Sequence, residues 1–79
     1  MNFTEADLPV EINHEQMVTL ADGTTIRFET NGEAKDVYVG DAFNPNVQLF
    51  PDCDYIVETP HGNFKVTAMF TDTCKVQKD

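Results

Sequence analysis

The chain has 79 residues, and its 14 Asp and Glu against five Lys and Arg give a formal net charge of −9. We expect residues 1–79 to form a single small domain with a thin core. No apolar run approaches the roughly 20 residues that span a bilayer, so no membrane association is expected. Five scattered bases do not make the basic patch that direct nucleic-acid binding needs. A hydrophobic content of 41 % argues against a disordered chain.

The acidic N-terminal segment, residues 1–15, contains no base and no apolar run like that of a signal peptide, which indicates a cytoplasmic protein. Within it, Thr4-Glu5-Ala6-Asp7 resembles a helix start, and Pro9 limits any helix there to about one turn. Residues 13–22 have two interpretations. A helix would be capped by Asn13, with Gln16 at its third position. The Met-Val-Thr-Leu run and the Asp-Gly turn that follows it favour a strand instead.

Alternating apolar and polar residues predict a first antiparallel meander, with strands at about 16–20, 24–30 and 33–39. Ala21-Asp22-Gly23 suits a three-residue hairpin loop with a left-handed glycine, which we expect to place Val18 opposite Phe28. Asn31-Gly32 suits a two-residue loop that places Ile26 opposite Val37 and Arg27 opposite Asp36. The inner face would then carry Val18, Leu20, Ile26, Phe28, Val37 and Val39.

A second meander follows, with strands at 55–57, 64–68 and 74–77. Pairing Thr59 with Phe64 places Val57 opposite Val66 and Glu58 opposite Lys65. Two three-stranded antiparallel meanders predict an all-β fold, either a small sandwich or an SH3-like or OB-like barrel. The aromatic side chains of this meander (Tyr55, Phe64 and Phe70) are expected to point inward as core residues, not outward as a base-stacking platform.

The crossover between the meanders, residues 40–52, is unusually apolar for a surface loop. Its apolar residues are Phe43, Val47, Leu49 and Phe50. One interpretation is that the crossover caps an open end of the core, in which case Phe50→Ala costs about 2–4 kcal/mol. The other is that it exposes a hydrophobic anchor for a partner.

Residues with reactive or metal-binding chemistry are few. The registers place Cys53 and Cys74 on either side of Phe70, about 9–10 Å apart, so we expect two reduced, largely buried thiols. His14 and its acidic neighbours match no known metal-ligand spacing. No phosphate-binding glycine loop or nucleophile motif is present in the sequence. We therefore expect no catalysis, no metal and no cofactor.

The charge and the lack of catalytic motifs predict a non-catalytic protein-binding module whose partner is a basic protein surface. One such surface is the groove of a nucleic-acid-binding protein, where carboxylates would stand in for phosphates. By analogy, small phage and mobile-element proteins that inhibit host defences, such as anti-CRISPR proteins and restriction inhibitors, have this size and charge. The alternative is a structural or assembly subunit that pairs, with itself or with a neighbour, through sheet edges or the 43–50 loop. The candidate partner-binding residues are Glu5, Asp7, Glu11, Glu15, Glu29, Glu33, Phe43 and Phe50.

Overall fold

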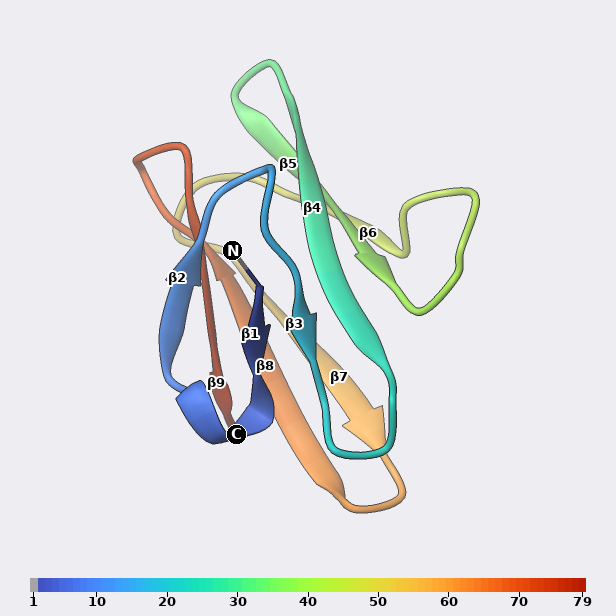
Figure 1. Ribbon diagram of the computed structural model, residues 1–79. Coiled ribbons are helices and arrows are strands. Elements are labelled where there is room, and N and C mark those ends of the chain that lie inside the picture. The colour runs from blue at the N-terminus through green and yellow to red at the C-terminus, as the bar shows by residue number, and fades with distance from the viewer. Residues whose placement is uncertain (1) are drawn as a thin grey trace.

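The computed structural model describes residues 2–79 as two facing β-sheets (Figure 1). Sheet 1 contains, in spatial order, β1 (Phe3–Thr4), β3 (Val18–Thr19), β4 (Thr25–Asn31), β5 (Ala34–Val39) and β6 (Val47–Leu49). Sheet 2 contains β2 (Val10–Ile12), β9 (Cys74–Lys78), β8 (Gly62–Ala68) and β7 (Asp54–Thr59). The pair β1–β3 is parallel, and the other pairs are antiparallel.

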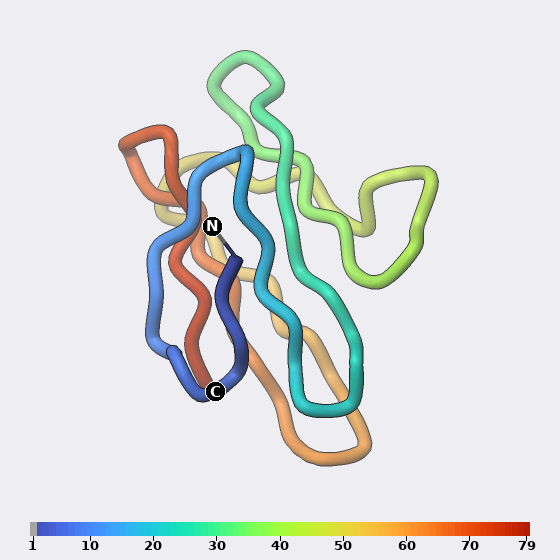
Figure 2. The backbone as a smooth tube through the Cα atoms, viewed as in Figure 1, coloured from blue at the N-terminus to red at the C-terminus, as the bar shows by residue number. Residues whose placement is uncertain are grey.

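Both predicted meanders are present, as β3-β4-β5 and β7-β8-β9, and the all-β fold with two sheets is confirmed. The described residues form an open sandwich and no closed barrel. A 3₁₀ turn, η1 (Glu5–Asp7), joins β1 to β2, so the N-terminal segment adds one strand to each sheet. Figure 2 shows the β3–β4 and β7–β8 turns at one end of the molecule and the β4–β5 turn at the other.

The core lies between the two sheets and follows from the period-two alternation of each strand. On β4, Ile26 and Phe28 are buried while Arg27 and Glu29 face outward. A fully buried aliphatic or aromatic side chain contributes about 1.5–3 kcal/mol to folding. The predicted inner face is buried except for Val39, which is half-buried. The whole cluster consists of Ile12, Val18, Leu20, Ile26, Phe28, Val37, Leu49, Val57, Phe64, Val66, Ala68, Cys74 and Val76.

The three predicted hairpin registers are each wrong by two residues. Val18 lies opposite Ile26, and Ile26 lies opposite Val39. Val57 lies opposite Phe64. A shift of two residues keeps every side chain on its predicted face, so the hydrophobic pattern alone does not distinguish these registers. On the outer faces the shift changes charge pairing, because Arg27 lies opposite Tyr38 and not Asp36.

The turns explain the shifts. The first loop has three residues as predicted, with Gly23 at φ 92°, but Leu20 bonds to Thr24 across it (2.8 Å). The second loop is Gly32-Glu33 and not Asn31-Gly32, with Gly32 at φ 64° in its first central position. Glycine there suits a type II′ turn, whose strand twist matches that of a type I′ turn. The third loop is Pro60-His61, a two-residue connection closed by Thr59 and Gly62.

Residues 13–22 form a turn and a strand, so the helix alternative is wrong. The Asn13 amide donates to Oε1 of Gln16 (3.0 Å), and the Gln16 amide donates to the Asn13 carbonyl (3.0 Å). The first bond is one half of a helix capping box, but the second closes a single turn, and the chain then enters β3 at Val18. The short N-terminal helical turn is present as η1, where the Thr4 amide donates to Oδ2 of Asp7 (2.8 Å).

The crossover packs on the core through Leu49 and Val47, two of its four apolar residues, and not through Phe43 or Phe50. Residues 47–49 form β6, which was not predicted and pairs with β5. Leu49 is 4 % exposed and joins the core, whereas Phe50 is 55 % exposed and Phe43 fully exposed. The predicted capping role of Phe50 is therefore wrong. Phe70 was predicted to be a core residue and is also exposed, because β8 ends at Ala68 and the chain leaves the sheet before it.

Candidate protein-binding surface

The outward side of sheet 1 carries a polar face built on its two longest strands. Because Ile26, Phe28 and Val37 point into the core, their neighbours on β4 and β5 point to solvent. The loop between β5 and β6 extends this surface. We call it the Arg27 face; it consists of Thr25, Arg27, Glu29, Asp36, Tyr38, Asp41 and Phe43.

Arg27, Glu29 and Tyr38 form a connected group at its centre. The Arg27 guanidinium carbon lies 4.1 Å from the centroid of the Tyr38 ring and covers it, leaving Tyr38 only 8 % exposed. Nη1 of Arg27 is 3.5 Å from Oε1 of Glu29, and the Tyr38 hydroxyl donates to Oε2 of Glu29 (3.2 Å). Loss of hydration, followed by the Glu29 charge, raises the pKa of Tyr38. The hydroxyl therefore remains a donor at neutral pH.

Two carboxylates face each other beside this group. Glu29 on β4 lies directly opposite Asp36 on β5. Asn31 supports Asp36 by donating from Nδ2 to Oδ2 (3.3 Å). Like charges directly opposite on a sheet destabilise it. Sequence reasoning missed this pair, because its register placed Arg27 opposite Asp36.

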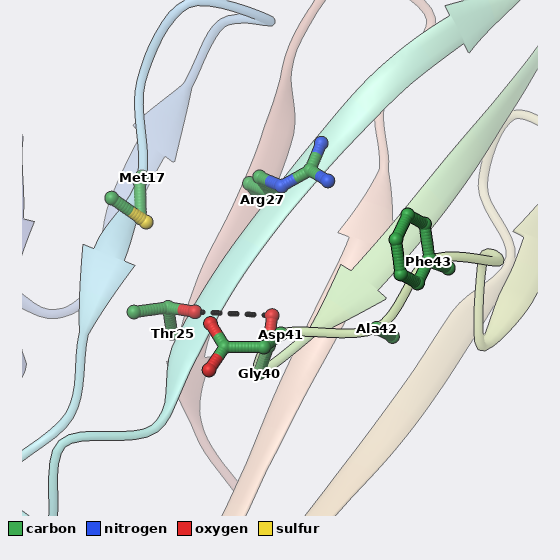
Figure 3. Close-up of a pocket in the computed structure, with 7 residues that line it drawn as sticks. All are labelled: Met17, Thr25, Arg27, Gly40, Asp41, Ala42 and Phe43. Atoms are coloured by element: carbon green, nitrogen blue, oxygen red, sulfur yellow. Dashed lines mark hydrogen bonds between the residues drawn. The ribbon is translucent and has the colours of Figure 1, made fainter.

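An open depression of about 440 Å³ lies at one side of the face (Figure 3). In Figure 3, Arg27 and Phe43 flank it, and the Asp41 carboxylate lies beside Thr25. The loop that carries Phe43 is fixed at its base, where the Gly40 amide donates to the Thr25 carbonyl (2.8 Å). A small ligand is usually enclosed on most sides, so an open depression suits a side chain of a protein partner better.

The predicted N-terminal acids are mostly engaged in local structure. Oε1 of Glu5 accepts the Ala21 amide (3.0 Å), and Asp7 accepts the Thr4 amide within η1. Glu11 lies on sheet 2, opposite Lys75, and accepts the Thr73 hydroxyl (3.2 Å). Glu5 and Asp7 both belong to η1, which lies outside the strands β4 and β5 that carry the Arg27 face.

The other predicted partner-binding residues lie in several parts of the molecule. Glu29 and His14 line the same shallow depression, and His14 neighbours Glu15. The structure therefore brings two of the predicted residues, Glu15 and Glu29, into one region. Glu33 lies at the tip of the β4–β5 turn. Phe43 belongs to the Arg27 face, but Phe50 lies after β6, in the turn that leads to sheet 2.

The two cysteines have different environments, and both are free thiols. Cys74 is fully buried on β9, and this burial raises its pKa to about 12. Cys53 is exposed, so the prediction that it is buried is wrong. It precedes β7 in a bulge where Asp52 has φ 70° and both the Asp52 amide and the Cys53 carbonyl bond to Ala68. Among residues 2–79, no group of three or more His, Cys, Asp and Glu side chains is placed to hold a metal ion.

Comparisons of the chain with protein-family models, with curated proteins and with solved structures give no match. In the part of the chain that the structure describes, no helix has the length and apolar character needed to cross a membrane. The Arg27 face is therefore interpreted from its own chemistry.

Proposed function

We propose that this chain is a non-catalytic acidic protein-binding module whose Arg27 face docks against a basic protein surface. The observation that carries the proposal is the pair of opposed carboxylates, Glu29 and Asp36. Opposed acids on an exposed sheet cost stability in the free protein, and a Lys or Arg from a partner would remove that cost. Positions that break a local stability rule are often functional.

The distribution of charge supports the same partner. Residues 2–49, which include every strand of sheet 1, contain nine Asp or Glu and only two bases. One of these bases, Lys35, is 4 % exposed and donates to the Met69 carbonyl (3.0 Å), and the other, Arg27, lies against Tyr38. Residues 50–79 are nearer balance, with five acids and three bases. On the Arg27 face itself the three acids Glu29, Asp36 and Asp41 outnumber the one base, Arg27, so the charge of this face is negative.

A basic groove that normally holds nucleic acid is the partner class that fits best. Carboxylates on the Arg27 face would occupy the positions of phosphates, and the net charge would speed the encounter at low salt. Phe43 would add the exposed aromatic contact that often anchors a protein interface. In this role the chain acts as an inhibitor, of the kind that phage and mobile elements direct against cytoplasmic defence proteins.

The test uses the immobilised protein, a bacterial lysate and washes of increasing salt. A captured nucleic-acid-binding protein should be released by duplex DNA or RNA and by about 0.5 M salt, where screening reaches only a few ångströms. The double variant Glu29→Gln, Asp36→Asn should capture much less of it. The matched control, Glu11→Gln together with Asp72→Asn, removes two charges from sheet 2 and its β8–β9 turn and should capture normally.

The outcome is interpretable because the double variant removes the repulsion between the carboxylates and is not expected to unfold. Thermal melts of both variants confirm that they are folded. A partner that stays bound unchanged above about 0.5 M salt, or that the double variant captures as well as the parent, contradicts the proposal.

The second candidate is an assembly subunit, favoured by the full exposure of Phe43 and the exposure of Phe70. Light scattering after size-exclusion chromatography discriminates the two functions. A strict monomer at high concentration argues against self-assembly, and a stable oligomer whose interface covers Phe43 argues against the inhibitor.

A further inference from the structure

The edge strands of the two sheets differ greatly in length. Among the described residues, sheet 1 ends in β1 and β6, with two and three residues, and sheet 2 ends in β2, with three residues, and β7, with six. Short strands, lysines, prolines and bulges are the usual protection of an edge. The sequence of β7, DYIVET, contains no lysine or proline, and the bulge at Asp52 and Cys53 lies before the strand begins. Within residues 2–79, β7 is therefore the one long edge strand that is free to accept another strand.

The register identifies the backbone groups that this edge presents. Thr59 and Gly62 close a two-residue hairpin, so they form a hydrogen-bonded pair, and hydrogen-bonded pairs alternate along an antiparallel ladder. The bond from the Ala68 amide to the Cys53 carbonyl (3.0 Å) agrees with this alternation, because Cys53 and Ala68 lie an even number of residues from Thr59 and Gly62. Residues 55, 57 and 59 thus bond to β8. The amides and carbonyls of Asp54, Ile56 and Glu58 point away from the sheet, and within residues 2–79 no hydrogen bond outside the ladders engages them.

The side chains of these same three residues form a pattern on the outer face of the edge. Asp54 and Glu58 are exposed acids, and the partly exposed Ile56 lies between them. The Thr67 hydroxyl donates to Oδ1 of Asp54 (2.7 Å) and holds that carboxylate in position. An added strand would therefore meet an acidic, an apolar and an acidic position in turn, spaced by two residues.

We propose that β7 is a strand-addition site for an extended basic peptide. The peptide carries Lys or Arg opposite Asp54 and Glu58, and an apolar residue opposite Ile56. Its backbone completes the ladder at the free edge, and its two basic side chains supply the specificity. This surface lies on the sheet opposite the Arg27 face, so the inference is independent of the inhibitory role proposed above.

A second copy of the chain fits this edge less well. The two-fold register that uses all three free residues pairs Ile56 with itself and places Asp54 opposite Glu58 of the other copy, twice. Like charges directly opposite destabilise the pairing, and each copy brings a net charge of −9. The two acids therefore act against self-association and in favour of a basic strand.

The test is an NMR titration of the full chain with a capped seven-residue peptide that has lysine at positions two and six and valine at position four. We expect the largest amide shifts at Asp54, Ile56 and Glu58. A peptide with glutamate in place of both lysines should bind at least about tenfold more weakly. A peptide N-methylated at the valine keeps its charges but loses a backbone donor, and should bind about five- to tenfold more weakly.

Two variants of Ile56 separate the contribution of its backbone amide to peptide affinity from that of its side chain. Ile56→Pro removes an amide that points to the free edge and leaves the ladder to β8 intact, so the chain should fold and lose about five- to tenfold in peptide affinity. Ile56→Thr keeps the amide and should change affinity by less than about threefold. If Ile56→Pro does not fold, the N-methylated peptide makes the same measurement on the parent chain.

Three results would overturn the proposal. The first is absence of peptide binding by the folded protein. The second is equal binding of the peptide and its N-methylated form, because strand addition requires the backbone bond. The third is amide shifts at the Arg27 face instead of β7, or a concentration-dependent dimer with the same shifts at β7. Loss of the inhibitory activity with retained peptide binding would leave this inference standing.

Discussion

Single residues of the same type behave differently because their surroundings differ, and the two cysteines are the clearest case. A thiol reacts as its thiolate, and burial disfavours that form at Cys74, where the pKa is raised to about 12. We expect a thiol reagent at pH 8 to label only Cys53 in the native protein and both cysteines in denaturant. Mass spectrometry after digestion assigns the labelled residue. Rapid labelling of Cys74 in the native state would contradict its place in the core.

Asp22 gives a pH dependence that belongs to one turn. A hydrogen bond from the Thr24 amide to its Oδ1 (2.9 Å) is the main cause that lowers the pKa of Asp22 from 3.8. Since the folded pKa is lower, this carboxylate stabilises the fold at pH values above 3.8, and the contribution is lost as the pH falls through the folded pKa. The comparison is made in about 0.5 M salt, which screens the net charge. At pH 7 the melting temperature of Asp22→Asn should be lower than that of the parent, and near pH 2 the two melting temperatures should be equal. A difference in melting temperature that persists near pH 2 would show that the effect of the substitution does not come from the charge of the Asp22 carboxylate.

At the level of elements, the crossover contributes to the core through β6 and not through its aromatic residues. Leu49 is buried among core residues and Phe50 is largely exposed. We expect Leu49→Ala to lower the free energy of unfolding by about 2–4 kcal/mol, and Phe50→Ala by less than about 1 kcal/mol. Urea denaturation measures both. The reverse order of the two effects would show that Phe50 caps the core after all.

The β4–β5 turn depends on one glycine. Gly32 has φ 64°, and a Cβ at this position would meet no neighbouring atom, so the cost of a substitution is conformational and not steric. Gly32→Val should therefore destabilise the chain by about 1–3 kcal/mol, because a β-branched residue resists positive φ. Glu33→Val, one residue along in the same turn, is the control and should cost less. Similar effects of the two substitutions would argue against the observed turn.

The same turns show how far the sequence could specify the elements. Alternation identified both meanders and the buried face of each strand, because the side-chain period of a strand is two. It did not fix the registers, because slips of two residues keep the faces unchanged. Turn residues decide between such registers. The prediction from Asn31-Gly32 was wrong because Gly32 occupies the first central position of the observed loop and not the second. β6 was missed because its three residues lie between two prolines, in a segment typical of a loop.

At the level of the whole molecule, composition indicated an acidic surface but not its location. The concentration of acids before residue 27 predicted partner-binding residues in the N-terminal segment. In the structure, Glu5 and Asp7 of this segment accept backbone hydrogen bonds. The opposed pair of the Arg27 face depends on the register of β4 and β5, and a slip of two residues replaces it with an apparent ion pair. A surface whose character depends on cross-strand neighbours therefore requires the correct register before it can be identified from sequence.

The salt dependence of stability separates the opposed acids from the net charge. The molecule measures 32 × 23 × 22 Å, so at about 0.01 M salt, where the screening length is about 30 Å, all of its charges interact. At about 0.5 M salt only neighbouring charges do. Glu29 and Asp36 are directly opposite, with α-carbons about 4.5–5.5 Å apart, and their repulsion should survive.

We therefore expect Asp36→Asn to raise the free energy of unfolding at both salt concentrations, by about 0.2–1 kcal/mol at the higher one. Asparagine retains an acceptor for Asn31 and leaves the ion pair between Arg27 and Glu29 in place. Asp41→Asn removes the same charge from the same face without an opposed carboxylate, so its gain should appear only at low salt. Urea denaturation at the two salt concentrations measures all three proteins. If Asp36→Asn gains no more than Asp41→Asn at high salt, the opposed pair costs the free protein nothing, and the argument from stability to a basic partner fails.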